Sequence, residues 1–181
     1  STIPAIIIQK AAGPLLNNFF ASKSIYYYAA FAYLVVGLSE ELSKFLMLRW
    51  YAYPKTAFDE PMDGIVYSVM VSMGFATLEN VLYVQQGGLQ VALLRMFLSV
   101  PAHAAFGVLM GYYVGLAKFN KERSGILLIK GVLAAAFFHG SFDFFLFVQQ
   151  NAAVTRQVSV GLLTLGAIAS WFIAIRLSLK S

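Results

Sequence analysis

Ionisable side chains inside long apolar stretches constrain the fold of this chain more than any other feature. Four of its eight acidic residues and both of its histidines lie in segments hydrophobic enough to cross a bilayer. An ionisable group at membrane depth costs about 3 kcal/mol on insertion scales. A chain that carries six such groups is expected to assemble a polar site within the membrane. The groups form four clusters: Glu40-Glu41-Leu42-Ser43-Lys44, Glu79-Asn80, His103, and His139 with Asp143.

The apolar runs around these clusters predict an all-α protein, a multi-pass transmembrane helix bundle. Charged residues make up 12% of the 181 residues, about half the share in soluble domains, and the mean hydropathy is +0.73. Five runs are long enough to span as helices, at about 25–51, 63–86, 89–118, 125–149 and 155–179. A sixth, N-terminal run at 3–20 is interrupted by polar residues and a proline, and we expect it to lie in the interface or to span marginally.

Residues 1–181 show no internal repeat or low-complexity tract and are expected to form a single membrane domain. The chain has no cysteine, which excludes disulfides and thiolate chemistry. Its net charge of +5 comes from Lys and Arg at segment ends, so no basic stripe indicates nucleic-acid binding. The loops of one side carry eight basic residues and those of the other carry three, which predicts a cytoplasmic C-terminus. The eight are Arg49, Lys55, Lys118, Lys121, Arg123, Lys130, Arg176 and Lys180, and the three are Lys23, Arg95 and Arg156.

The first cluster places two carboxylates and one lysine on a single helix. Lys44 lies four residues after Glu40 and three after Glu41, so its amine reaches either carboxylate. Adjacent helical residues point about 100° apart, so the two glutamates cannot face one cavity equally. We expect one to activate water and the other to pair with Lys44, and we assign the water to Glu40. A buried ion pair that only stabilises packing is the alternative.

The remaining clusters supply further polar groups on separate helices. Glu79 is either functional or a protonated glutamate bonded to a neighbouring helix, and Asn80 points to a different face. His103 alone is more often a packed, satisfied histidine than a ligand. His139 and Asp143 stand at i and i+4, so they share a helix face and the carboxylate can orient the ring.

Together the clusters indicate hydrolysis within the membrane, which requires a base for water, donors for an oxyanion and a cavity that retains water. A glutamate with two histidines is also a common ligand set of catalytic zinc. The expected zinc ligands are His103, His139 and one glutamate, for which we take Glu79. The His-Glu-x-x-His pattern is absent, so both a zinc site assembled from several helices and a metal-free site stay open.

The ordered motifs resemble those of the PrsW family of intramembrane proteases, which is related to the CAAX prenyl protease and bacteriocin-immunity (ABI) superfamily. The resemblance covers about residues 39–143. The motifs that carry it are Glu40-Glu41-x-x-Lys44, Phe75-x-x-x-Glu79-Asn80, His103-x-x-Phe106-Gly107 and His139-x-x-x-Asp143.

The resemblance implies a multi-pass helical hydrolase with its site within the membrane. It makes Glu40 or Glu41 the base that activates water, and His139 with Asp143 the pair that stabilises the oxyanion. Glu79 stands where CAAX-type members have a histidine, which leaves open whether the mechanism uses a metal or a glutamate alone. The implied substrates are single-pass membrane proteins, typically anti-sigma factors.

Two other classes of function remain open from the sequence. Membrane carboxylates and histidines also form proton or cation relays, so a transporter or channel is the first alternative. A non-catalytic membrane binding or immunity protein, whose polar cluster only stabilises the bundle, is the second. The lipid bilayer is the expected surrounding in all three cases, and the oligomeric state is open.

Overall fold

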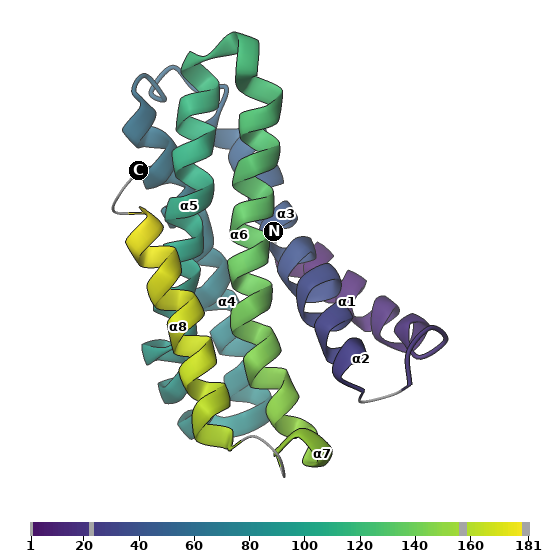
Figure 1. The fold of residues 1–181 in the computed structure, drawn as a ribbon. Coiled ribbons are helices and arrows are strands. Elements are labelled where there is room, and N and C mark those ends of the chain that lie inside the picture. The colour runs from purple at the N-terminus through teal and green to yellow at the C-terminus, as the bar shows by residue number, and fades with distance from the viewer. Residues whose placement is uncertain (1, 22–23, 156–158, 179–181) are drawn as a thin grey trace.

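A computed structural model describes residues 2–21, 24–155 and 159–178 (Figure 1). Every regular element of these residues is helical, as the sequence predicts. The α-helices are α1 (Thr2–Leu16), α2 (Ile25–Ala30), α3 (Leu38–Met47), α4 (Pro61–Phe97), α5 (Ser99–Phe119), α6 (Ser124–Phe147), α7 (Ala152–Thr155) and α8 (Val160–Ser178). Wider π-helical turns, η1 (Phe31–Gly37) and η2 (Leu48–Ala52), flank α3, and short 3₁₀ turns, η3 (Lys121–Arg123) and η4 (Val148–Gln150), flank α6.

Three segments of the described residues are helices long and apolar enough to cross a membrane: Pro61–Gln85, Gly88–Phe119 and Lys121–Phe147. The expected count of five spans is therefore not confirmed. The stretch predicted at 25–51 is helical but divided by π-helical turns, and parts of the run at 155–179 lie outside the described residues. Lys23, Arg156 and Lys180, which entered the prediction of orientation, also lie outside them, so the cytoplasmic C-terminus stays a prediction.

Helices α4 and α5 pack with their backbones in direct contact. Glycines recur every fourth residue along α5, and their missing side chains allow this approach. A Cβ at Gly107 would lie 2.8 Å from Ser72 Oγ, and a Cβ at Gly111 or Gly115 would collide with the α4 backbone at Gly64 or Pro61. This contact fixes the helix that carries Glu79 against the helix that carries His103.

The chain reverses direction inside the segment assigned to α4. Gly88 has a φ of 73°, a left-handed conformation that glycine adopts without steric cost. Beyond it the chain runs back alongside the first half of α4, so that Arg95 lies 2.7 Å from Glu79. A straight helix would separate these two residues by about 24 Å. The turn at Gly88 therefore returns a basic side chain to the level of Glu79.

The segment from Ile25 to Ala52 presents the first cluster to the bundle. It begins at an N-cap, where Ser24 Oγ accepts a hydrogen bond of 3.1 Å from Tyr27 N. Glycines bring η1 onto α6, because a Cβ on Gly37 would lie 2.8 Å from Ala136 O and one on Gly140 would lie 2.9 Å from Tyr33 Cα. A π-helical turn adds a residue to the helical repeat, so the turns on both sides of α3 set which of its faces points inward.

Helix α1 lies beside α2 and η1. Helices α1 and α2 lean away from the bundle of α4, α5, α6 and α8 (Figure 1). The buried side chains of α1 are Thr2 and Ala5. Ile3 and Ile7 on its outer face are 72% and 63% exposed, which suits contact with lipid. The structure contains no bilayer, so whether α1 spans or lies in the interface stays a prediction.

Candidate active site

The inner face of α3 buries three ionisable side chains completely. Glu40 is 3% exposed, Glu41 0% and Lys44 1%. The Lys44 amine lies 2.6 Å from Glu41 Oε1 and 3.8 Å from Glu40 Oε2. It therefore reaches both carboxylates, as predicted, and Glu41 is the closer of the two. Lys44 also lies over the Phe75 ring, 4.5 Å from its centroid. The two glutamates thus differ in their surroundings, as their 100° separation predicts.

Lys44 connects α3 to His103 on α5. Its amine lies 2.9 Å from His103 Nδ1, and an ammonium group only donates, so Nδ1 accepts. The neutral ring then carries its proton on Nε2, which lies 3.1 Å from Glu79 Oε2 and donates to it. Arg95 holds the same Glu79 oxygen at 2.7 Å. A continuous polar chain therefore runs from Glu41 through His103 to Arg95.

His139 on α6 is surrounded by carboxylates. Its Nδ1 donates to Glu41 Oε1 at 2.8 Å, and its Nε2 lies 3.3 Å from Asp143 Oδ2 and 3.8 Å from Glu40 Oε2. Phe106 stacks on the ring at 5.1 Å between centroids and an angle of 18°. Glu41 and Phe106 thereby fix the plane of the ring, and Nε2 points toward the carboxylates of Glu40 and Asp143.

A cavity of about 230 Å³, which we call the site cavity, lies where these helices meet. Glu40 is the carboxylate of α3 that reaches it. Its Oε1 accepts a hydrogen bond of 3.0 Å from Gln9 Nε2, and its buried Oε2 has no hydrogen-bond partner among the described residues. Glu41 is not among the lining residues. The polar lining residues are Gln9, Glu40, Glu79, Tyr83, Arg95, Ser99, His103, His139 and Asp143.

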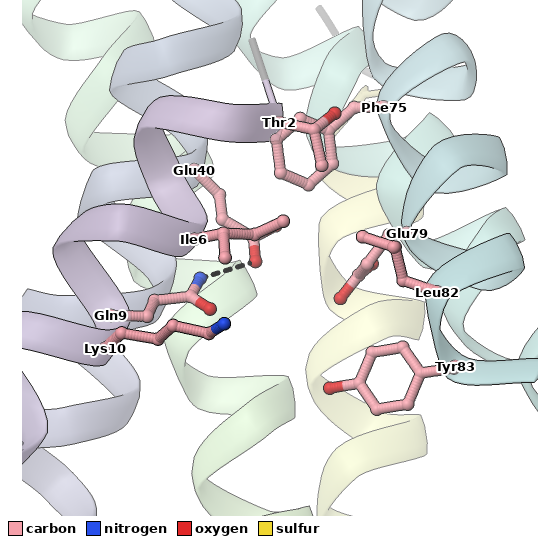
Figure 2. A pocket seen from close by; sticks show the side chains of 9 residues that line it. All are labelled: Thr2, Ile6, Gln9, Lys10, Glu40, Phe75, Glu79, Leu82 and Tyr83. Carbon is pink, nitrogen blue, oxygen red and sulfur yellow. Dashed lines mark hydrogen bonds between the residues drawn. The ribbon is translucent and has the colours of Figure 1, made fainter. Parts of the chain in front are cut away.

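A second cavity, of about 260 Å³, lies between α1 and α4, and we call it the entry cavity. It shares Gln9, Glu40, Glu79 and Tyr83 with the site cavity. Figure 2 shows Gln9 and Lys10 of α1 on one side and Glu79, Leu82 and Tyr83 of α4 on the other, with the Gln9 amide directed at Glu40. The other lining residues are Thr2, Ile6 and Phe75.

Comparison with known proteins identifies the family of this chain. The model of the PrsW family of intramembrane metalloproteases matches residues 1–175. The chain belongs to the PrsW family. Its motif resemblance is thereby confirmed, and helices of membrane-spanning length accord with the intramembrane character of the family. No solved structure matches the chain at a significant level.

Several curated members of the PrsW family are similar to this chain. Protease PrsW of Geobacillus kaustophilus is 43% identical over 123 residues, which cover 68% of this chain and 55% of that protein. Protease PrsW of Shouchella clausii is 39% identical over 145 residues, covering 80% and 64%. Protease PrsW of Bacillus subtilis is 41% identical over 121 residues, covering 66% and 56%. The chain thus spans less than two thirds of the length of each of these relatives.

Because the family is described as metalloproteases, we asked whether the residues of the site cavity can hold a metal ion. Among the described residues, Glu40, His103 and His139 bring one potential ligand atom each within 4.8 Å of one another. Glu40 Oε2 is unpartnered, and the bond from His139 Nδ1 to Glu41 is the support that a metal-bound histidine usually has. Metal on His103 Nε2 requires a proton on Nδ1, so Lys44 would have to release that atom.

Charge also favours a cation in the site cavity of this PrsW-family chain. Glu40, Glu41, Glu79 and Asp143 stand in or directly behind it, against the two basic side chains Lys44 and Arg95. With all of these ionised and both histidines neutral, the formal charge is −2, which one divalent ion balances. The residues therefore fit a zinc-type ion, provided that Lys44 shifts.

The structure brings seven of the eight residues named from the sequence into one connected network. Glu40, Glu79, His103, His139 and Asp143 line the site cavity, and Lys44 with Glu41 stands behind it. Glu79, the glutamate named with the histidines as a metal ligand, bonds to His103 but is outside the compact set of three. Asn80 lines neither cavity, and its buried Oδ1 has no hydrogen-bond partner in the described part of the chain.

Four polar residues of the site cavity were not among the candidates from the sequence: Gln9, Tyr83, Arg95 and Ser99. Arg95 was counted as a charge at a helix end, and only the reversal at Gly88 brings it back to Glu79. Gln9 interrupts the apolar N-terminal run, and this is the signal that could have identified it. A polar residue in an otherwise apolar segment is therefore as good a candidate for a site residue as a carboxylate in such a segment.

Proposed function

We propose that this chain is an intramembrane endopeptidase that hydrolyses a peptide bond of single-pass membrane proteins. The observation that carries the proposal is the buried, unpartnered Oε2 of Glu40, which lies 3.8 Å from His139 Nε2 in a polar cavity between membrane-length helices. The family supports this reading, because its curated members are named as proteases. A protein of anti-sigma-factor type is the proposed substrate class.

In the proposed mechanism Glu40 holds the reacting water. Its free Oε2 accepts a proton from the water as the oxygen attacks the scissile carbonyl, and the carboxylic acid then passes that proton to the leaving amine. His139 faces the same space and, when protonated, donates from Nε2 to the developing oxyanion. Glu41 keeps the ring in place through Nδ1, and Asp143 stabilises its positive charge.

A zinc ion would be held by Glu40, His103 and His139. When bound, it would polarise the water and the scissile carbonyl. Glu41 would then orient His139 as a ligand, and Glu79 would accept the water's proton in place of Glu40, since it adjoins His103 at 3.1 Å. The two routes share the position of the water and differ in what removing Glu40 does to the metal content.

The test is cleavage of a co-reconstituted single-pass membrane protein by the wild type, Glu40→Gln and the control Glu122→Gln. Glu122 lies exposed in η3, away from the site. We expect Glu122→Gln to cleave like the wild type and Glu40→Gln to lose about 10²–10⁴-fold in rate. Cleavage by Glu40→Gln at the wild-type rate would refute the proposed function.

Elemental analysis of the same samples separates the two routes. Loss of zinc in Glu40→Gln assigns Glu40 as a ligand. Full activity of chelated, metal-free wild type excludes the zinc route and leaves the glutamate route alone.

A further inference from the structure

A hydrogen bond joins Gln9 of α1 to Glu40 of α3, a residue that lines both the site cavity and the entry cavity. Gln9 Nε2 donates to Glu40 Oε1 at 3.0 Å, from a helix that contributes no other bond to the site residues among the described contacts. A glutamine side chain ends in a carboxamide, the same chemical group as a peptide bond. Figure 2 shows this amide on the α1 side of the entry cavity, directed at Glu40, with the side chains of α4 across the cavity.

Helix α1, which carries Gln9, is held more weakly than the helices around the catalytic groups. It packs mainly on α3 and η1 and touches α4 far less. Its 15 residues bury only Thr2 and Ala5, and Pro14 near its end lacks the N–H that would bond back along the helix. Few buried contacts and an interrupted hydrogen-bond ladder are the features of a segment that moves at low free-energy cost.

Two other grooves between the described helices are lined by none of the candidate catalytic residues. A groove of about 540 Å³ between α3 and α6 is lined by apolar side chains with Arg49, including Leu46 and Ile129, and by none of the candidate catalytic residues. A smaller groove between η1 and α6 is lined by Tyr33, Leu34, Leu38, Leu133, Ala136 and Phe137. The entry cavity is lined by Glu40 itself.

We propose that the space between α1 and α4 is the entrance for substrate, and that Gln9 is a latch that holds α1 against Glu40 until a substrate amide replaces it. This rests on the proposed function and adds the route and the residue that controls it. The segment that enters is an unwound, extended stretch of a transmembrane helix, because only an unpaired backbone amide can make the bond that Gln9 gives up. Lys10, exposed beside Gln9, places a positive charge at this entrance.

The first experiment fixes α1 in place. The natural chain has no cysteine, so a pair introduced by Ile6→Cys and Leu82→Cys across the entry cavity can be joined with a short reducible cross-linker. A matched control joins Leu46→Cys to Ile129→Cys across the α3–α6 groove. Each protein is assayed in the same liposomes before cross-linking, after it and after reduction, with the co-reconstituted single-pass substrate.

We expect cross-linking across the entry cavity to reduce cleavage at least about tenfold and reduction to restore it, while the control pair keeps its rate. Unchanged cleavage with α1 fixed would overturn the proposal, and so would a loss confined to the α3–α6 pair.

The second experiment removes the latch. Gln9→Leu keeps the size of the side chain and deletes a hydrogen bond to a charged group, so we expect kcat/KM for substrate to rise about fivefold through a lower KM. Ile8→Leu, on the exposed side of the same helix, is the control and should leave both constants unchanged. A fall in kcat with KM unchanged would instead make Gln9 a residue that positions Glu40, and would refute the latch.

A third measurement tests the route of the substrate independently of cleavage. A model single-pass peptide with a photo-reactive residue at its centre is cross-linked to inactive Glu40→Gln protein, and the labelled residues are mapped. Labelling of Ile6 and Leu82 supports the entrance even where no cleavage is found, whereas labelling of Leu46 and Ile129 overturns it. Absence of cleavage by the wild type with labelling at the entrance refutes the proposed function and not the route.

Discussion

The two sides of Glu40 are built differently. On one side, α3, α5 and α6 enclose Glu41, Lys44 and His139 at 0–3% exposure, and glycine contacts bring α5 onto α4 and η1 onto α6. On the other side, α1 meets Glu40 through one glutamine amide and exposes most of its apolar face. The closely packed side keeps the reacting groups in a fixed geometry. The loosely packed side can give way, so a long substrate can reach a site that must otherwise exclude lipid.

The packed side should depend most strongly on Lys44. We expect Lys44→Met to lower the free energy of unfolding by about 3–5 kcal/mol, because it leaves Glu41 charged and buried without its closest cation. Thermal unfolding in detergent measures this, with exposed Lys130→Met as the control. The double variant Glu41→Gln/Lys44→Met should recover part of the loss. If Lys44→Met melts like Lys130→Met, the charge network does not hold this side together.

A smaller loss is expected from a methyl group at the α4–α5 contact. Gly111→Ala places a Cβ against the backbone of Gly64 and Ile65, and overpacking of this kind costs about 1–3 kcal/mol. Gly74→Ala is the matched control, since a Cβ there meets nothing within 4 Å, and it should be neutral or stabilising by up to about 1 kcal/mol. Equal melting temperatures of the two variants would contradict the backbone contact.

The smallest effect on stability is expected at Arg95, on the border between the two sides. Arg95 and Glu79 are 20% and 16% exposed, more than Lys44 and Glu41, and His103 still bonds to Glu79 when Arg95 is changed. We therefore expect Arg95→Gln to cost about 1–2 kcal/mol. Cleavage should still fall about tenfold, because Glu79 loses the group that holds it beside His103, and Arg95→Lys should restore part of the rate. Arg123→Gln in η3 is the control. A rate for Arg95→Gln equal to that of this control would remove Arg95 from the site.

The packed side was largely predictable from sequence, for a physical reason. Charged residues at membrane depth must find partners. A shared polar cavity is therefore predicted for Glu40, Lys44, His103 and His139, whatever the exact placement of their helices. Spacing along one helix also predicted that Lys44 reaches both glutamates, and the distances of 2.6 and 3.8 Å agree. Spacing does not decide which glutamate is the closer partner, because neighbours at i, i+3 and i, i+4 are both within reach on one helix.

The loosely packed side was not predictable in the same way. Gln9 is uncharged, and an amide at uncertain depth indicates no partner by itself. Arg95 returns to Glu79 only because Gly88 takes a left-handed conformation, and the glycine pair at 87–88 predicts a turn without giving its direction. The five expected spans came from hydropathy alone, which does not account for the π-helical division of 25–52.

The central claim is that the adjacent residues Glu40 and Glu41 have different roles. In the proposed mechanism Glu40 activates the water, and Glu41 holds Lys44 and His139 in place. The most direct test is to measure the cleavage rate and the melting temperature of Glu40→Gln and Glu41→Gln side by side, with the wild type as reference. We predict that Glu40→Gln loses cleavage by about 10²-fold or more and melts within a few degrees of the wild type. We predict that Glu41→Gln melts at a clearly lower temperature, because Lys44 and His139 lose their shared acceptor. Equal losses of rate and of melting temperature in the two variants would contradict this division.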